Sequence, residues 1–100
     1  MQIIPLSLKE AEDYLAKHER HYKAPAEPIC AVGVGEVDHA GTNKYPTIHG
    51  AAILGRSDSG AGWTAELAHI YVDGTSQGYS LLYGACWRAL KALGYVKCVL

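Results

Sequence analysis

Two residues in the apolar segment 64–72 could take part in acid–base chemistry. Glu66 carries a carboxylate that can act as a general base, and His69 follows three residues later. The segment is predicted to be a strand, and side chains an odd number of residues apart on a strand point to opposite faces. At most one of the two is therefore expected to face a given site. Glu66 could equally well have a structural role, as the partner of a cation such as Arg56 in an ion pair.

A second group lies near the predicted end of a helix, where His18 and His21 are three residues apart. These imidazoles could bind an acidic acceptor, act as a base or cap the helix C-terminus as cations, and capping is the simplest interpretation. The spacing also places both on one helical face, as for zinc ligands. No acid or thiol lies at a supporting spacing, so no metal site is expected. Lys23 is interpreted as a solvated charge.

A glycine-bearing turn, DGTSQG at 73–78, precedes the longest predicted helix. Its glycines permit positive φ or a close approach to the backbone, and Thr75 or Ser76 can cap the helix. The first helical amides lack intrahelical acceptors and lie at the positive end of the helix dipole, which suits a diphosphate. The glycine spacing falls short of a full phosphate-loop signature, so an ordinary capped turn is favoured on local grounds. Tyr79 is either a packing residue or a side chain that reaches a nucleotide or donates a proton.

Apolar residues at helical spacing predict a long helix after this turn. It is expected to end before Gly94, a residue suited to a left-handed position after a helix. The apolar arc is wide, so we expect the helix to be largely covered. Segment 95–100 is predicted to be a strand parallel to 64–72, because a strand, helix and strand joined in this way usually form a parallel crossover. The arc consists of Leu82, Cys86, Ala89 and Leu93 in one stripe and Tyr83, Trp87 and Leu90 in a second.

The first half of the chain predicts a strand, a helix and a hairpin. Segment 2–6 is a short strand, and Ser7 and Glu10 form a capping box that begins an amphipathic helix. Segments 29–37 and 47–54 are predicted to pair as antiparallel strands with a long tip. The full order is strand, helix, strand, strand, strand, helix, strand. We therefore expect an α+β fold, a mixed sheet with helices on its faces.

The 100 residues are expected to form one domain, 1–100. Nine Lys and Arg against ten Asp and Glu give a formal net charge of −1, which argues against a nonspecific nucleic-acid binder and against a DNA mimic. Cys30, Cys86 and Cys98 are odd in number and form no Cys-x-x-Cys pair, so we expect buried thiols in a reducing compartment. No apolar run approaches the ~20 residues of a membrane span and no signal peptide is evident, so a cytoplasmic protein is expected.

The order of elements, with a glycine-bearing turn between a central strand and its helix, resembles the GNAT-type N-acetyltransferase fold. Two motifs are similar to those of small GNAT-like proteins encoded in phage and prophage genomes. The first is HERHYKAP at 18–25. The second is DGT at 73–75, followed by LYGACWRA at 82–89 and LGY at 93–95. The resemblance covers most of the chain and stops after the family's fifth strand, so the family's following helix and last strands are expected to be missing.

The resemblance implies that acetyl-CoA lies between two splayed parallel strands. Its diphosphate would be held by backbone amides of Gly74, Thr75, Ser76, Gln77 and Gly78, with Ile70, Tyr71 and Val72 beside the pantetheine. The candidates for acid–base catalysis are Glu66, His69, His21 and Tyr79. The candidates on the acceptor side are His18, His21 and Lys23. The acceptor is an amine whose identity the sequence does not specify.

Two functions from different classes fit these features. The first is N-acyl transfer from acetyl-CoA, which the turn and the histidine motif favour. The second is a GNAT-like binding module without catalysis, such as a phage-encoded inhibitor that binds a host defence protein complex. The missing C-terminal elements and the lack of a basic residue in the turn favour this second function. A sheet that ends at segment 95–100 would also leave an exposed edge, so we expect a homodimer that covers it.

Overall fold

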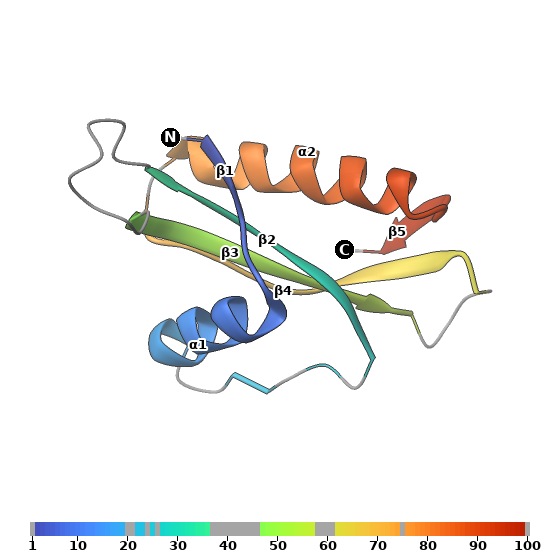
Figure 1. Cartoon of the computed structure of the whole chain (residues 1–100), viewed down its shortest axis with the longest axis horizontal. Coiled ribbons are helices and arrows are strands. Elements are labelled where there is room, and N and C mark those ends of the chain that lie inside the picture. Colours follow the sequence, from blue (N-terminus) through green and yellow to red (C-terminus); the bar gives the residue numbers. More distant parts are fainter. Residues whose placement is uncertain are drawn as a thin grey trace.

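A five-stranded mixed sheet lies between two helices in the computed structural model of the chain (Figure 1). Its strands follow one another in the order β1-β2-β3-β4-β5; β1 to β4 are antiparallel neighbours, and β5 is parallel to β4. This confirms the expected α+β class and the order of elements. The elements are β1 (Gln2–Pro5), α1 (Leu8–His18), β2 (Pro28–Glu36), β3 (Thr47–Arg56), β4 (Thr64–Val72), α2 (Ser76–Ala92) and β5 (Lys97–Val99). The structure describes residues 2–19, 22–23, 25, 27–36, 47–57, 62–74 and 76–99.

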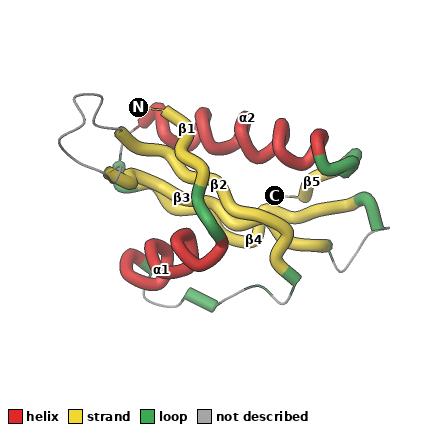
Figure 2. The backbone as a smooth tube through the Cα atoms, viewed as in Figure 1, coloured by secondary structure: helices red, strands yellow, loops and turns green. Residues whose placement is uncertain are grey.

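Helix α1 begins at the predicted capping box. The Ser7 side chain accepts a hydrogen bond from the Glu10 amide at 3.1 Å, and the Glu10 carboxylate accepts one from the Ser7 amide at 2.9 Å. Ala11 and Leu15 are fully buried and pack on β3 through a narrow apolar stripe, as expected for this helix. One face of the sheet is thereby covered by α1, whereas α2 covers the other face (Figure 2).

Helix α2 ends in a Schellman motif, as the position of Gly94 predicts. Gly94 has φ +93°, and its amide donates to the Lys91 carbonyl at 3.1 Å. The Tyr95 amide donates to the Leu90 carbonyl at 2.9 Å, so two of the last helical carbonyls are satisfied. Leu82, Cys86 and Leu90 are buried over the sheet. The chain then turns back and enters β5 parallel to β4, which confirms the predicted crossover.

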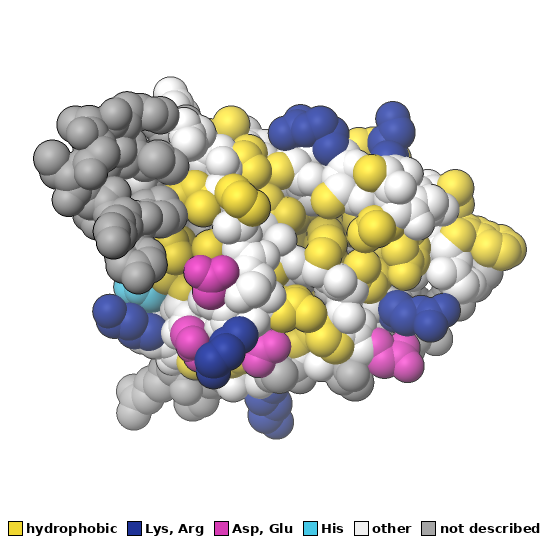
Figure 3. Space-filling view, viewed as in Figure 1, with side chains coloured by type: hydrophobic (Ala, Val, Ile, Leu, Met, Phe, Trp, Pro, Cys, Tyr) yellow, Lys and Arg dark blue, Asp and Glu magenta, His cyan; other side chains and the backbone are white. Residues whose placement is uncertain are grey.

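Part of the apolar arc of α2 is not covered, contrary to the sequence prediction, although Leu90 of the second stripe is fully buried. Tyr83 and Trp87 are 43% and 41% exposed, and Leu93 is 57% exposed. The reason is the position of the helix over the sheet: α2 packs mainly on β2 and β3, so one flank extends toward the short strand β5. Basic side chains lie on the outer surface of α2, and hydrophobic side chains occupy the surface between this helix and the sheet (Figure 3).

The remaining boundaries differ from the predicted ones by a few residues. The first strand ends at Pro5, the hairpin strands span Pro28–Glu36 and Thr47–Arg56, and β5 begins two residues later than predicted, at Lys97. The tip of the hairpin and Leu100 lie outside the described residues. Neither α1 nor α2 is both long and apolar enough to cross a lipid bilayer.

Candidate functional site

The turn after β4 has the glycine geometry that its sequence predicts. Gly74 has φ +101°, a conformation that L-residues other than glycine rarely adopt. Gly78 lies in the first turn of α2, and a Cβ there would be 2.5 Å from Cγ1 of Val72. One glycine therefore reverses the chain and the other allows the helix to approach β4 closely. The predicted caps are not tested, because Thr75 and the side chain of Ser76 lie outside the described part of the structure.

The electrostatic environment of the turn is acidic. The segment 73–78 contains no lysine or arginine. Nδ1 of His49 lies 2.6 Å from Oδ2 of Asp73, and Nε2 of His49 lies 3.9 Å from Oε2 of Glu36. The Asp73 amide also donates to the His49 carbonyl at 2.9 Å, which fixes the two residues opposite each other. A phosphate at the start of α2 would thus meet helical amides that have no intrahelical acceptor and, close by, the Asp73 carboxylate.

Sequence reasoning missed His49, because its neighbour is determined by strand register. Gly50 pairs with Val72 between β3 and β4, so the next residues along, His49 and Asp73, face each other across the sheet. The two residues are 24 positions apart in the chain. Only an Asp directly after a predicted strand, combined with a correct register, could have indicated this pair.

A β-bulge on β4 overturns the expectation that Glu66 and His69 point to opposite faces. Leu54 pairs with Leu67 whereas Ile53 pairs with His69, so Ala68 is an extra residue without a partner on β3. Leu67 packs with the core under α2, which directs Glu66 to the opposite, α1 side. The extra residue shifts the alternation, and His69 then also lies on the α1 side. Both candidates therefore share one face, and Glu66 is half-buried.

His69 joins β4 to the end of α1 and to the segment that follows. Its Nε2 donates to the Lys23 carbonyl at 2.7 Å, and its Nδ1 lies 3.3 Å from Oε2 of Glu19. The Tyr22 ring packs 4.7 Å away, measured between ring centroids. Lys23, predicted to hold the acceptor, contributes its backbone carbonyl here.

His18 stacks on Tyr71, the next residue of β4 that faces α1. The two ring centroids are 5.2 Å apart with planes inclined by 17°, and the Tyr14 ring lies 4.4 Å from His18. Tyr71 therefore points away from Ile70 and Val72, which pack under α2. His21 lies outside the described residues.

Two tyrosine hydroxyls on this face are buried without a hydrogen-bond partner in the described part of the chain. They belong to Tyr14 and Tyr22. Burial raises the pKa of Tyr14 to about 12, with smaller contributions from Asp73 and Tyr71. Burial also raises the pKa of Tyr22, and Glu12 and Glu19 add to the effect. Both hydroxyls therefore remain protonated at neutral pH, and both are shielded from solvent.

His69, Tyr71 and Asp73 form one row on the α1 side of β4. They alternate along the chain and span about 13 Å at the ~3.3 Å rise per strand residue. Three histidines meet at this row, because His18 and His49 contact its other members. Imidazoles, carboxylates and hydroxyls together can bind an amine and accept a proton from it.

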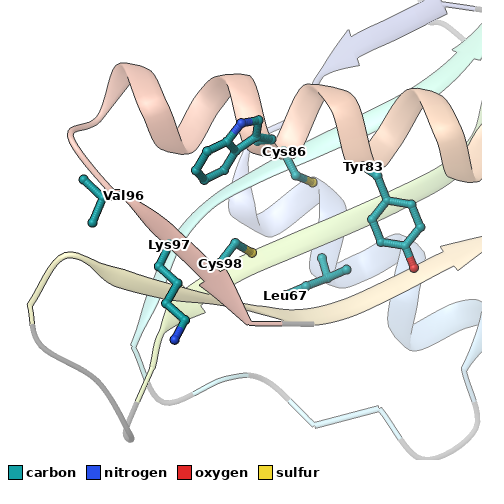
Figure 4. Close-up of a pocket in the computed structure, with 7 residues that line it drawn as sticks. Leu67, Tyr83, Cys86, Val96, Lys97 and Cys98 are labelled. Carbon is teal, nitrogen blue, oxygen red and sulfur yellow. The ribbon is translucent and has the colours of Figure 1, made fainter.

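A cavity of about 410 Å³ lies on the opposite, α2 side of the sheet (Figure 4). The side chains of Leu67, Cys86 and Cys98 point toward one another between the helix and the strands. Burial raises the pKa of Cys86 to about 12, with Cys30 and Cys98 contributing, and burial raises the pKa of Cys98. None of the three cysteines forms a disulfide, the raised pKa values keep their thiols neutral at neutral pH, and of the three only Cys86 is buried. The described residues that line the cavity are Leu67, Tyr83, Cys86, Trp87, Val96, Lys97 and Cys98.

The position of the cavity follows from how β4 and β5 pair. The two strands are paired from Thr64 with Lys97 to Glu66 with Val99. Beyond Glu66, β4 continues to Val72 without a neighbour on that side in the described structure. Tyr79 lies on the same flank of α2, 42% exposed, with its ring 6.5 Å from that of Tyr83. It is not a core residue, and it does not line the cavity.

The candidate residues thus fall on the two sides of the sheet. Glu66, His69, His18 and the Lys23 carbonyl lie toward α1, whereas Ile70, Val72 and Gly78 lie toward α2. Within the described ranges, no three His, Cys, Asp or Glu side chains converge in a way that could hold a metal ion. No model of a known protein family matches the chain, and no curated protein or solved structure matches it significantly.

Proposed function

We propose that this chain has a GNAT-like fold and transfers an acyl group from an acyl-CoA thioester to an amine. The observation that carries the proposal is the open edge of β4 beyond Glu66, along which no described residue of β5 pairs with it. A pantetheine arm contains two amides and can pair with such an edge as an added strand does. The edge leads at one end to the cavity and at the other to the turn at Gly74 and Gly78.

The bulge supports the proposal at the reacting carbonyl. Ala68 has no partner on β3, so its peptide group is outside the regular ladder. A backbone amide released in this way can donate to the oxygen of a thioester carbonyl as negative charge develops there. The amine nitrogen attacks the carbonyl carbon, the carbon–sulfur bond breaks, and the CoA thiolate leaves and takes up a proton.

Glu66 is the base in this scheme. Its carboxylate lies on the α1 side, next to the bulge, so an amine that approaches from this side can pass its proton to Glu66. His69 is a poorer base, because both of its ring nitrogens already face acceptors, the Glu19 carboxylate and the Lys23 carbonyl. Tyr79, at the start of α2, is the candidate donor to the thiolate. His18 is assigned to acceptor binding.

An assay of thiol release tests the proposal. Acetyl-CoA and a panel of amines are mixed with the protein, and binding of CoA is measured in parallel. We expect Glu66→Gln to lower turnover and to leave CoA binding unchanged, because the amide retains the shape of the side chain and loses its basicity. Unchanged turnover would remove Glu66 from the role of base.

A binding module without catalysis is the second candidate, and the exposed aromatic flank of α2 favours it. Tyr79, Tyr83 and Trp87 are each more than 40% exposed, and Trp63 at the start of β4 is 58% exposed. Large aromatic side chains contribute most of the energy in many protein interfaces. The partner would be a host protein or a second copy of the chain. A stoichiometric partner recovered from host lysate, lost in Trp87→Ala, would support this function.

A further inference from the structure

The cavity under the exposed flank of α2 is much larger than an acetyl group requires. Its volume is about 410 Å³, and a water molecule in the liquid occupies about 30 Å³. An acetyl methyl group would leave most of this space to water. We infer that this protein accepts an acyl group with a longer aliphatic chain, and that the aliphatic chain lies in the cavity between α2 and β5. The inference rests on the proposed function and specifies its donor substrate.

The lining of the cavity suits a hydrocarbon chain. Leu67, Val96 and the aromatic rings of Tyr83 and Trp87 offer apolar surface, and none of the described residues that line the space carries a carboxylate. The thiol of Cys86 is neutral at physiological pH, because burial raises its pKa to about 12. A polar or charged occupant would lose its hydration without gaining partners, at a cost in free energy. A methylene chain gains from the same burial.

The one charged residue of the lining does not change this conclusion. Lys97 is exposed and lies on β5, and its amine points away from α2 and out of the space between helix and strands (Figure 4). Its position at the rim leaves the interior of the cavity apolar. A free carboxylate could be drawn to this amine, so a fatty acid is the alternative source of the same aliphatic chain.

The cavity also lies at the correct end of the open edge. Leu67 lines it and directly follows Glu66, the last residue of β4 that pairs with β5. From Leu67 to Val72 the open edge measures about 16 Å at the ~3.3 Å rise per strand residue. A thioester with its nucleotide at the turn after Val72 would place its carbonyl near Ala68. Its acyl chain would then continue into the cavity on the α2 side, while the amine approaches from the α1 side.

Calorimetric titration with CoA, acetyl-CoA, hexanoyl-CoA, octanoyl-CoA and octanoate tests the inference. Each methylene that is buried should tighten binding about fourfold. We expect hexanoyl-CoA to bind at least tenfold more tightly than acetyl-CoA. Equal affinities for CoA, acetyl-CoA and octanoyl-CoA would overturn the inference and leave the proposed function standing. If octanoate binds as tightly as octanoyl-CoA, the protein binds the aliphatic chain of a free acid and does not recognise the thioester. If no CoA compound binds, the proposed function itself fails.

Two variants test whether the aliphatic chain lies in this cavity. Cys98→Phe fills the cavity from β5 and should reduce the affinity for hexanoyl-CoA to that for acetyl-CoA, with CoA binding unchanged. Tyr83→Ala removes a half-exposed aromatic ring that lines the cavity. This variant keeps the test decisive if thermal unfolding shows that Cys98→Phe does not fold. Leu93→Ala is the matched control, since Leu93 is an exposed apolar residue directly after α2 that does not line the cavity. A dependence on chain length that is unchanged in Tyr83→Ala would contradict this location.

Discussion

Two glycines of α2 should respond in opposite ways to the same substitution. A Cβ at Gly78 would lie 2.5 Å from Cγ1 and 3.4 Å from Cγ2 of Val72, a buried residue of β4. A Cβ at Gly84 would lie 3.1 Å from Nη1 of Arg88, the free end of a long, exposed side chain. Val72 cannot move without disturbing the core, whereas the Arg88 guanidinium can. Gly78→Ala should therefore destabilise the protein, and Gly84→Ala should stabilise it.

The expected magnitudes follow from two opposing effects. Replacing a glycine within a helix by alanine stabilises a protein by roughly 0.5–1 kcal/mol. Gly84→Ala should gain about this amount. At Gly78 the same gain is offset by overpacking against Val72, which costs about 1–3 kcal/mol. The net loss should be about 1 kcal/mol, so the two variants should differ by about 2 kcal/mol in free energy of unfolding.

Urea denaturation of the wild type and both variants measures this difference. With an m-value of about 1–2 kcal/mol per molar urea, the two midpoints should lie about 1 to 2 M apart. The wild-type midpoint should lie between them. Equal midpoints for Gly78→Ala and Gly84→Ala would refute the close approach of α2 to β4, and with it the geometry of the turn that the proposed function uses.

Three further results are expected. Asp73→Asn should tighten CoA binding severalfold at low salt, because it removes a negative charge beside the proposed diphosphate site and retains an acceptor for His49. An unchanged affinity for CoA would place the phosphates elsewhere. Cys86 should make the free energy of unfolding fall as pH rises from about 9 toward about 12, because folding raises the pKa of Cys86 and the unfolded chain releases that proton first. Cys86→Ala should lower this slope, to which one thiol contributes at most about 1.4 kcal/mol per pH unit. Light scattering at micromolar concentration should give the mass of a dimer, and a monomeric mass would count against a second copy on the exposed flank of α2.

Features of the fold that depend on nearby residues were predicted correctly from the sequence. Ser7 and Glu10 are three residues apart and form the capping box, and Gly94 ends α2 in the left-handed conformation expected of it. The order of strands also follows from local signals, because each strand is bounded by turn residues. These interactions are determined within one or two turns of chain, so the sequence contains the information directly.

Features that depend on strand register could not be predicted. The bulge at Ala68 shifts the alternation of β4 and places Glu66 and His69 on one face, whereas a regular strand would separate them. The contact of His49 with Asp73 requires the exact pairing of β3 with β4. A local pattern carries neither piece of information, because both arise from pairing between segments far apart in the chain.

The exposed flank of α2 was mispredicted for a different reason. Apolar spacing shows that Tyr83 and Trp87 share a side of the helix, and a wide apolar arc usually indicates burial. Burial also requires sheet beneath that side, and within the described residues α2 packs mainly on β2 and β3. The position of the helix over the sheet is a property of the whole fold, so the helix sequence could not reveal it. The same mismatch opens the cavity on which the further inference depends.

Backbone amide shifts of the isotope-labelled protein during titration with CoA test the central claim most directly, because they report both binding and location. We predict saturable changes along the open edge of β4, from Leu67 to Val72, and at Gly74 and Gly78 in the turn. Amides of α1 far from β4, such as those near Lys9, should not change. No change at millimolar CoA, or changes confined to α1, would contradict the assignment of an acyl-CoA site to this edge.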